Sequence, residues 1–193
     1  VKLGFEPFKY GLIKRRLLEG QAEDVEDWAV GHPLLFPNIL AQGAQDVPQL
    51  QFRTPVDDTH TLHIGYKTKL RPAGTPAAPM KVGREKVCDH SGKIIAENIN
   101  KQDFPAWVAQ GAINDRTREH LSASDTGVAL YRRLLKEAPD AVARGEDPMG
   151  VIRDRTENEP WIALHRETET LTAYESNYQL GIDRIDKVNV SGE

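Results

Sequence analysis

Residues 100–137 read NKQDFPAWVAQGAINDRTREHLSASDTGVALYRRLLKE, and the second half of this stretch carries the strongest helical pattern in the chain. Its apolar side chains recur every three or four positions, at Val128, Tyr131, Leu134, Leu135 and Ala138. Arginine, lysine and glutamate occupy the opposite side, as in a helix that packs one face against a core. The residues that offer N-caps in front of it are Ser122, Ser124 and Asp125. The sequence therefore predicts a long amphipathic helix here.

Prolines and a glycine set the expected helix ends. Pro139 should end or kink the long helix, because proline lacks an amide hydrogen and its ring clashes with the preceding turn. Residues 141–144 can add a further turn before Gly145 stops the helix. A shorter helix is predicted over Gln102–Gly111, which Pro105 can start, since proline is tolerated in a first turn.

The first 70 residues predict strands, because their short apolar stretches are punctuated by glycine, proline and aspartate and do not follow helical spacing. One predicted strand covers Phe8–Leu18. Trp28–Leu40 contains an apolar run that Pro33 and Pro37 interrupt, which argues against a helix. We expect irregular extended structure there.

Leu50–Val56 and Thr59–Leu70 flank Asp57-Asp58 and form the clearest hairpin candidate in the sequence. Residues 71–83 carry three prolines and two glycines and are predicted to form a loop. A strand-rich first half followed by a long helix predicts an α+β domain, with an antiparallel sheet wrapped over the helix and a cavity between the layers.

Composition removes several classes of function. The chain has 25 Lys plus Arg against 29 Asp plus Glu, a net charge of −4, so it lacks the positive field that nucleic-acid binding needs. No apolar run approaches a membrane span, and we expect a soluble protein. The single cysteine, Cys88, cannot form an internal disulfide, which favours a reducing, cytoplasmic compartment. Residues 156–193 are expected to be a polar C-terminal extension.

The six histidines do not form an obvious metal motif; they are His32, His60, His63, His90, His120 and His165. His60 and His63 are three apart, so on a strand they would face opposite sides of the sheet. Cys88 and His90 have no second thiol to complete a zinc site. A phosphate-binding glycine loop and a nucleophile elbow are also missing from the sequence.

Asp103 is the carboxylate of most interest. In the ordinary reading it lies near the start of the short helix and accepts backbone N–H bonds, with Trp107 one turn further on. Asp115 can form an ordinary surface pair with Arg116 or Arg118.

Several separated motifs nevertheless resemble the C-terminal catalytic part of Rieske non-haem iron oxygenases, in the branch of phthalate dioxygenase and the O-demethylases. In the second half of the chain the matching motifs are Gln102-Asp103, Gly111-Ala112-Ile113, Asp115-Arg116, Glu119-His120-Leu121, Ser124-Asp125, Gly127-Val128 and Arg132-Arg133 with Leu134. In the first half they are Tyr10-Gly11, Arg15-Arg16, Phe36-Pro37-Asn38 and the run from Arg53 to Thr59. The likeness covers most of residues 1–155.

The resemblance implies a helix-grip fold (Bet v 1-like or START-like) and a mononuclear Fe(II) held by two histidines and one aspartate. Asp103 matches the carboxylate ligand, and such a ligand set leaves open positions for O₂. The two histidines should be five residues apart, a spacing that this chain lacks. One cysteine also cannot supply both thiolates of a Rieske [2Fe-2S] cluster. The chain (residues 1–193) is therefore expected to be the C-terminal part of a catalytic domain, an incomplete fragment that is inactive alone, with these elements upstream of Val1.

The same resemblance implies the partners and the reaction. An aromatic substrate is hydroxylated or O-demethylated with O₂, electrons come from NAD(P)H through a flavin and iron–sulfur reductase, and the subunits form a homotrimer. An aryl carboxylate substrate would suit Arg15, Arg16 or Arg53, because arginine pairs bidentately with carboxylates. Arg53 alternates with Leu50 and Phe52, however, which more simply places it facing solvent.

Other interpretations stay open. Trp107 could form an apolar wall for the substrate, but core packing explains it equally well. A helix-grip protein could also carry an apolar small molecule without a metal, since a fold alone does not determine function. A third possibility is a trimer-forming structural domain whose interface includes residues 115–125.

Overall fold

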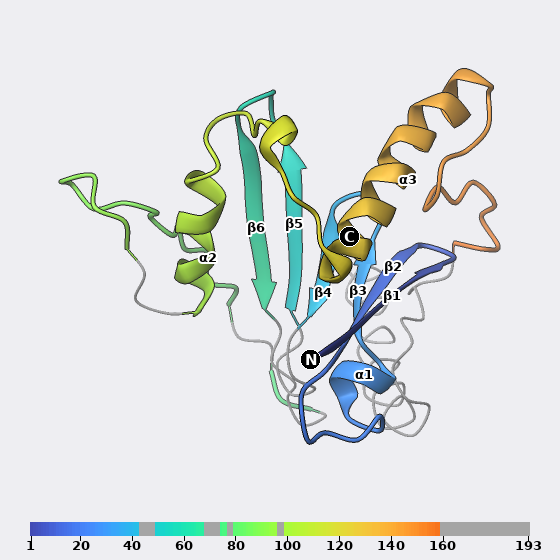
Figure 1. Cartoon of the computed structure of the whole chain (residues 1–193), viewed down its shortest axis with the longest axis horizontal. Helices are drawn as coiled ribbons and strands as arrows, with labels where there is room; N and C mark the ends of the chain where they lie inside the picture. Colours follow the sequence, from blue (N-terminus) through green and yellow to red (C-terminus); the bar gives the residue numbers. More distant parts are fainter. Residues whose placement is uncertain (43–48, 68–73, 77–78, 96–98, 159–193) are drawn as a thin grey trace, which may run out of the picture. The chain divides into compact units, whose positions relative to one another are not determined.

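The computed structural model describes residues 1–42, 49–67, 74–76, 79–95 and 99–158 (Figure 1). The chain divides into two compact units. The first takes Val1–Arg53, His63–Thr75 and the described residues from Leu121 onward, and the second takes Thr54–Leu62 and Pro76–His120. The predicted tail over residues 159–193 and the loop residues 71–73 and 77–78 lie outside the described part.

A six-stranded antiparallel sheet dominates the described structure, and its strands follow one another in sequence order. They are β1 (Lys2–Phe8), β2 (Gly11–Leu17), β3 (His32–Leu35), β4 (Ile39–Gln42), β5 (Gln49–Pro55) and β6 (Thr61–Lys67). Three α-helices are described: α1 (Glu26–Ala29), α2 (Ile99–Val108) and α3 (Thr126–Ala143). The 3₁₀ turns are η1 (Arg116–Arg118) and η2 (Ala123–Asp125). The sheet and the C-terminal helix confirm the predicted α+β class.

The two faces of the sheet can be followed through the strand register, because opposed residues in antiparallel strands share a face. Leu12 is opposite both Pro7 and Leu34, Leu34 is opposite Leu40, and Leu40 is opposite Gln51. Residues two apart along a strand also share a face, so Phe5 and Arg53 belong to this same side. We call it the α3 face.

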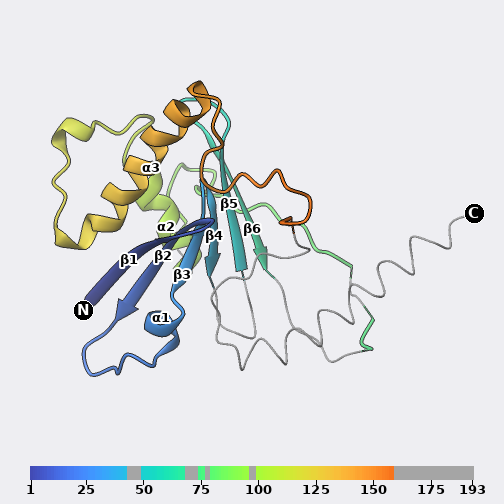
Figure 2. The same ribbon diagram turned by 90° about the vertical axis from the view of Figure 1, so that its right-hand side faces the viewer.

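Helix α3 packs on the α3 face through close contacts at its N-terminal half (Figure 2). Gly127 is buried against the ring of Phe5, and a Cβ at position 127 would overlap that ring. One turn further along, Tyr131 Oη donates a hydrogen bond to the carbonyl of Pro37 at 2.7 Å. The Tyr131 ring stands edge-on to Phe36, with 6.3 Å between the ring centroids. These contacts join the helix to the β1 strand and to the β3–β4 turn.

The start of α3 follows its predicted capping residues. Ser122 and Asp125 form a capping box around η2, in which the Asp125 carboxylate accepts the backbone N–H of Ser122 at 2.8 Å. The Ser122 hydroxyl also donates to this carboxylate, at 3.0 Å, and the two bonds from Ser122 lower the pKa of Asp125, the backbone N–H more than the hydroxyl. Helix α3 then begins at Thr126.

The expectation that Pro139 ends or kinks α3 is wrong as to the end, since the helix continues to Ala143. Two backbone hydrogen bonds from the residues after α3 close its last turn. Gly145, with φ of +77°, donates to the carbonyl of Val142, and Glu146 donates to that of Ala141, each at 2.9 Å. This pair of bonds is a Schellman motif, which satisfies the last helical carbonyls without help from residue 139.

For Trp28–Leu40 the expectation of extended structure is confirmed, but the expectation that it is irregular is wrong, because this range contains β3 and the first two residues of β4, joined by a short turn. Pro33 fits into β3 because it pairs with Ile13 at a position that needs no amide hydrogen. Phe36 donates its backbone N–H to the carbonyl of Tyr10 at 2.8 Å, so the amide of Phe36 points toward β2. Amides point alternately to the two sides along a strand, so at Pro33, three positions earlier, the amide position points away from β2.

The predicted hairpin across Asp57-Asp58 is confirmed by β5 and β6. Val56 donates its backbone N–H to the His60 carbonyl at 2.9 Å, which closes the turn. The Asp57 carboxylate accepts the backbone N–H groups of Thr59 and His60, both at 2.8 Å. An aspartate that bonds to the backbone two and three residues ahead is a typical turn former. The end of the predicted second strand, residues 68–70, lies outside the described residues.

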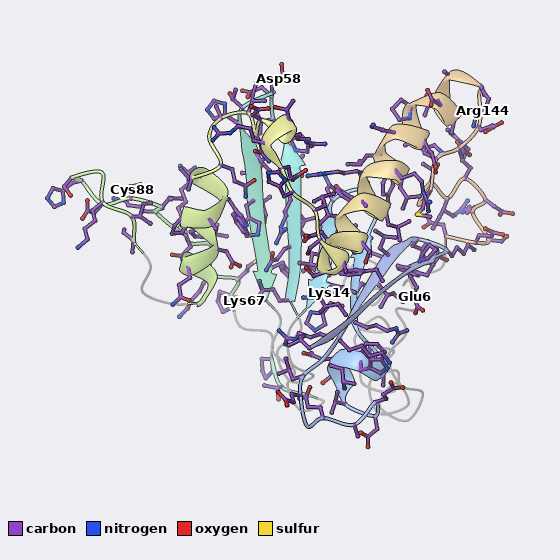
Figure 3. All side chains as sticks on the ribbon, in the orientation of Figure 1. Glu6, Lys14, Asp58, Lys67, Cys88 and Arg144 are labelled. Atoms are coloured by element: carbon purple, nitrogen blue, oxygen red, sulfur yellow. The ribbon has the colours of Figure 1, made fainter. Side chains whose placement is uncertain are left out.

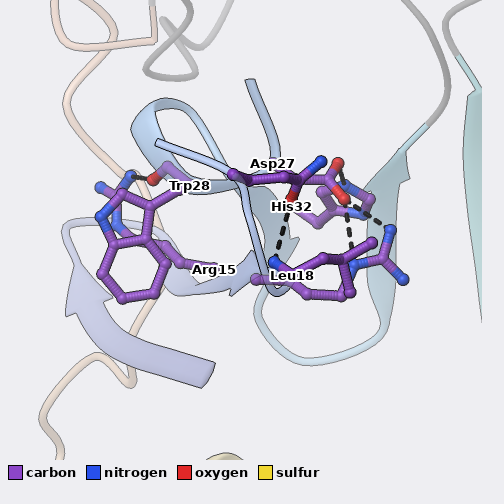
Figure 4. Close-up of polar contacts among 7 residues, drawn as sticks. Arg15, Leu18, Asp27, Trp28 and His32 are labelled. Atoms are coloured by element: carbon purple, nitrogen blue, oxygen red, sulfur yellow. Dashed lines mark hydrogen bonds and ion pairs between the residues drawn. The ribbon is translucent and has the colours of Figure 1, made fainter. Parts of the chain in front are cut away.

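The segment between β2 and β3 is tied to the sheet by a group of polar contacts around Asp27 (Figure 4). Its carboxylate accepts from the Arg16 guanidinium at 3.0 Å and lies 2.9 Å from Nε2 of His32. The hydrogen bond from His32 lowers the pKa of Asp27, partial burial opposes this, and the Arg16 side chain adds to the lowering. Arg15 donates to the backbone carbonyls of Trp28 and Ala29. These bonds anchor α1 beside the β2 strand.

Few side chains in the described residues are buried; the apolar ones are Leu12, Ile13, Val30 and Ala41, and the polar one is Gln51. None of the described helices combines the length and the apolar character that a membrane span requires.

We expect Gly127→Ala to destabilise the protein by about 1–3 kcal/mol, because the new methyl group overpacks against Phe5. Thermal unfolding measures this change. In a Phe5→Ala background the same substitution should be neutral or stabilising, since alanine is the better helix former. Gly83→Ala is the control, because a Cβ there meets no atom within 4 Å. Equal losses with and without Phe5 would contradict the close contact.

We expect Asp27→Asn to lower the free energy of unfolding by about 1 kcal/mol at pH 7, and we expect this difference to shrink as the pH falls below the ordinary carboxyl pKa. The folded-state pKa of Asp27 is lowered, so its contribution is present above the ordinary carboxyl pKa and is lost as the pH falls through the folded value. Unfolding curves measured from pH 7 to pH 3 test this. The exposed neighbour Asp24, changed to Asn, should leave the pH dependence as it is.

Candidate functional site

Asp103 lies in the middle of α2 and not at its start. The helix begins at Ile99, three residues before the predicted start, so Pro105 is inside it and Asp103 is its fifth residue. The expectation that Asp103 caps the helix or is held by free N–H groups of the first turn is therefore wrong. The carboxylate is exposed, and within the described part of the chain it has no hydrogen-bond or ion-pair partner.

An aromatic pair accompanies Asp103 on α2. Trp107 follows Asp103 by four residues and Phe104 by three, so it shares a helix face with both. The Phe104 and Trp107 ring centroids are 5.4 Å apart, with the rings tilted by 54°. The Trp107 side chain is 36% exposed. The helix thus presents a carboxylate next to a partly exposed indole.

The helix ends shortly after this pair. Ala109 donates to the carbonyl of Pro105 at 2.8 Å, and Gly111 donates to that of Val108 at 3.1 Å. Gly111 has φ of +83°, a backbone conformation that glycine adopts without strain. The turn therefore follows the last residue of α2, Val108, and fixes the length of the helix that carries Asp103.

Asp115 has a structural role. It is the N-cap of η1, and its carboxylate accepts the hydroxyl of Thr117 at 2.6 Å and the backbone N–H of Thr117 at 3.0 Å. These two bonds, the hydroxyl first, lower the pKa of Asp115. The predicted pairing with a neighbouring arginine is replaced by this capping of the turn.

The residues described here do not supply a complete iron site. No group of three or more histidine, cysteine, aspartate or glutamate side chains comes close enough to hold a metal ion in the described ranges. His60 lies outside β6 and contacts the turn carboxylate of Asp57 at 2.9 Å, whereas His63 is within β6. Cys88 lies on the loop before α2 (Figure 3). One carboxylate, Asp103, does not fit Fe(II) by itself, since such sites need at least three protein ligands.

The three candidate arginines lie on two strands. Arg15 and Arg16 are on β2: Arg15 donates to Glu6 at 3.1 Å and to the carbonyls of Trp28 and Ala29 in α1, and Arg16 pairs with Asp27. Arg53 is on β5, and the register places both Arg53 and Arg16 on the same side as Phe5, the α3 face.

The expectation that Arg53 faces solvent while Leu50 and Phe52 face the core is wrong. Leu50 and Phe52 are only half-buried and lie on the opposite face of β5, whereas Gln51 is 4% exposed and shares the α3 face with Arg53. Arg53 Nη2 donates to Gln51 Oε1 at 2.8 Å. Sequence reasoning missed Gln51, because a glutamine between two apolar residues has the pattern of a solvent-facing position.

Tyr131 is a second residue that the sequence did not single out for the site. Burial raises the pKa of its hydroxyl group, and the positive charge of Arg53 counteracts part of that rise. Arg53 thus acts electrostatically on the helix residue that is bonded to Pro37. The only signal in the sequence was the place of Tyr131 on the apolar side of the predicted helix.

Comparison with known proteins agrees with the motifs found in the sequence. Residues 84–178 match the family described as LigXa C-terminal domain like. The chain is 32% identical over 182 residues to the 5,5'-dehydrodivanillate O-demethylase oxygenase subunit of Sphingobium sp. (strain NBRC 103272 / SYK-6), which covers 91% of this chain and 42% of that protein. It is 37% identical over 128 residues to the phenoxybenzoate dioxygenase subunit alpha of Ectopseudomonas oleovorans, covering 61% of this chain and 29% of that protein.

A shorter match, 43% identical over 49 residues, links it to the phthalate 4,5-dioxygenase oxygenase subunit of Pseudomonas putida, over 25% of this chain and 11% of that protein. The chain thus spans less than half the length of these relatives. The matched proteins are oxygenase subunits, and the predicted resemblance is confirmed. The chain belongs to the family of oxygenase subunits of Rieske-type dioxygenases and O-demethylases.

Proposed function

We propose that this chain is part of the oxygenase component of an enzyme that hydroxylates or O-demethylates an aromatic compound with O₂. The observation that carries the proposal is the state of Asp103. It is an exposed carboxylate in the middle of a helix, it has no structural partner among the described residues, and a partly exposed indole lies one turn away. A carboxylate that the fold itself does not use is available for a ligand.

Asp103 would serve as the carboxylate ligand of a mononuclear Fe(II). The remaining ligands, two histidines, and the ligands of a Rieske [2Fe-2S] cluster would come from residues upstream of Val1 in a longer subunit. This division accounts for a chain with one cysteine and with no histidine pair five apart. It is supported by relatives that are more than twice as long as the matched region.

The same proposal includes the partners of the subunit. A flavin and iron–sulfur reductase would deliver electrons from NAD(P)H, and three subunits would assemble so that one subunit's cluster serves its neighbour's iron. We place this enzyme in the cytoplasm. The names of the relatives, which are oxygenase subunits and an alpha subunit, support an enzyme of several components.

The substrate we propose is an aryl carboxylate. Three of the relatives are named for dehydrodivanillate, phenoxybenzoate and phthalate, each of which has a carboxylate on an aromatic ring. Arg53 is the arginine candidate that we favour, because it lies on β5 beside the buried Gln51, whereas Arg15 and Arg16 contact α1. An arginine guanidinium pairs with a carboxylate through two parallel hydrogen bonds. Trp107 would provide an apolar contact for the ring.

In the full-length subunit, we expect Asp103→Ala to lose bound mononuclear iron while the absorption of the Rieske cluster is retained, because only the iron loses a ligand. Iron content by elemental analysis and the visible spectrum measure the two centres separately. Asp115→Asn is the matched control, since it removes a carboxylate from the same unit but keeps an N-cap acceptor. Full iron occupancy and turnover in Asp103→Ala would exclude Asp103 as the ligand.

For the substrate, we expect Arg53→Ala to weaken binding of the acids by at least about tenfold, because a charged hydrogen-bonding partner is lost. The probes are 5,5'-dehydrodivanillate, phenoxybenzoate and phthalate, and calorimetry gives the dissociation constants. Arg133→Ala is the control, because Arg133 lies on the exposed side of α3 and pairs with Glu137. Unchanged affinity for all three acids in Arg53→Ala would remove the carboxylate from the proposal.

A further inference from the structure

The second compact unit, Thr54–Leu62 with Pro76–His120, is poorly packed in itself. Each of its side chains that the structure describes is exposed or half-buried, and none is buried. The buried apolar side chains of the described chain, such as Leu12 and Ile13, all belong to the first unit. Apolar burial is the main favourable contribution to the stability of a folded domain. The described part of the second unit therefore has no core of its own.

Large apolar side chains of this unit are exposed to solvent. Ile113 is 72% exposed and Val108, at the end of α2, is 56% exposed. On the loop before α2, Met80 and Val82 are exposed as well. Single apolar residues on a surface are ordinary, but several within one unit that lacks buried side chains mark a surface that packs against another protein segment.

The backbone of this unit is nevertheless ordered by local polar contacts. The Asp89 carboxylate accepts the backbone N–H of Ser91 at 2.8 Å, and Asp115 accepts that of Thr117 at 3.0 Å. Aspartates that bond to the backbone two residues ahead are typical of tight turns. The turns on either side of α2 therefore have a defined shape, although the apolar side chains between them are not packed away.

Helix α2 gathers apolar side chains on one side. Trp107 follows Phe104 by three residues and Val108 follows it by four, so these three lie side by side on the helix. Asp103, four residues before Trp107, borders this apolar side. We call these four residues the α2 face. Its chemistry is apolar with one carboxylate at the edge, and Trp107 and Val108 are among the exposed apolar residues of the chain.

Two observations indicate which protein segment covers the α2 face. The relatives are more than twice as long as the region that matches this chain, and the family model that matches residues 84–178 describes a C-terminal domain, so a longer subunit has ample chain on the N-terminal side. The face is also strongly apolar, and permanent contacts are more apolar than those made with a partner that binds and leaves, such as a reductase. A segment of the same subunit fits both observations.

We infer that the α2 face is the surface on which the part of the subunit upstream of Val1 packs, so that the second unit buries its apolar side chains against that part. The inference rests on the proposed function for the existence of the longer subunit. It also agrees with the role proposed for Asp103, because residues that share one metal ion with it must lie within a few Å of its carboxylate. The matching surface is then apolar, with polar groups opposite Asp103.

The test uses the full-length oxygenase subunit with the photo-crosslinking residue p-benzoylphenylalanine in place of Val108. Irradiation bonds this residue to a C–H group that it touches, and mass spectrometry identifies the attached peptide. Oligomers assembled from ordinary and heavy-nitrogen subunits distinguish bonds within a subunit from bonds between subunits. We expect crosslinks to peptides upstream of Val1 in the same subunit, at about fivefold the yield of a solvent-facing position, because packed side chains lie within about 4.5 Å of their neighbours.

Ala106 is the matched control position. It is exposed, and two residues along a helix turn it almost to the opposite side from Val108. Thermal unfolding identifies a variant that does not fold, and p-benzoylphenylalanine in place of Trp107, which exchanges one aromatic group for another, then decides. The inference is overturned by crosslinks that reach only a second subunit or only residues 1–193 of the same subunit. It is also overturned if position 108 crosslinks no more than position 106.

The iron content of Asp103→Ala separates this inference from the proposal beneath it. Crosslinks to a second subunit, together with loss of iron in Asp103→Ala, refute the packing surface and leave the proposed function standing. Crosslinks to upstream residues of the same subunit, together with full iron occupancy in Asp103→Ala, support the packing surface and remove Asp103 as the ligand.

Discussion

The contact between Gly127 and the ring of Phe5 sets the distance between α3 and the sheet. A hydrogen atom in place of a side chain lets the helix approach the β1 strand until the aromatic ring meets its backbone. The Tyr131 hydroxyl then reaches the carbonyl of Pro37, which a more distant helix would leave out of range. That bond positions the β3–β4 turn, whose Asn38 carbonyl accepts the backbone N–H of Arg53. Arg53 in turn contacts the buried amide of Gln51. Close packing at one glycine therefore governs the polar groups of the α3 face.

Much of the architecture could be predicted because local signals and packing agree. The spacing from Val128 to Ala138 and the caps at Ser122 and Asp125 describe α3 as it is, and Asp57 identifies the hairpin. The errors came from prolines. Judged from the local sequence, Pro33 should interrupt a strand and Pro139 should end a helix. Pro33 occupies a position in the β2–β3 ladder that needs no amide hydrogen. Beyond Pro139, a Schellman motif closes α3.

The site was less predictable than the fold, because the relevant facts depend on distant parts of the chain. The alternation of Leu50, Gln51, Phe52 and Arg53 defines two faces but does not say which one a helix covers. That choice is made by residues of α3 far along the sequence. For Asp103, the residue type and its motif identified the position, but the predicted role at the helix start is wrong, because Asp103 is the fifth residue of α2 and does not cap it.

The hydrogen bond from Tyr131 to Pro37 joins residues that are 94 positions apart, whereas the strands of the sheet pair with their neighbours in the sequence. A ribosome that adds about 5–20 residues per second needs roughly 5–20 s to cover that distance. During this time the first strands can form a meander, yet one apolar face of it has no helix to cover it. The nascent chain therefore exposes the α3 face of the sheet to solvent until α3 has been synthesised.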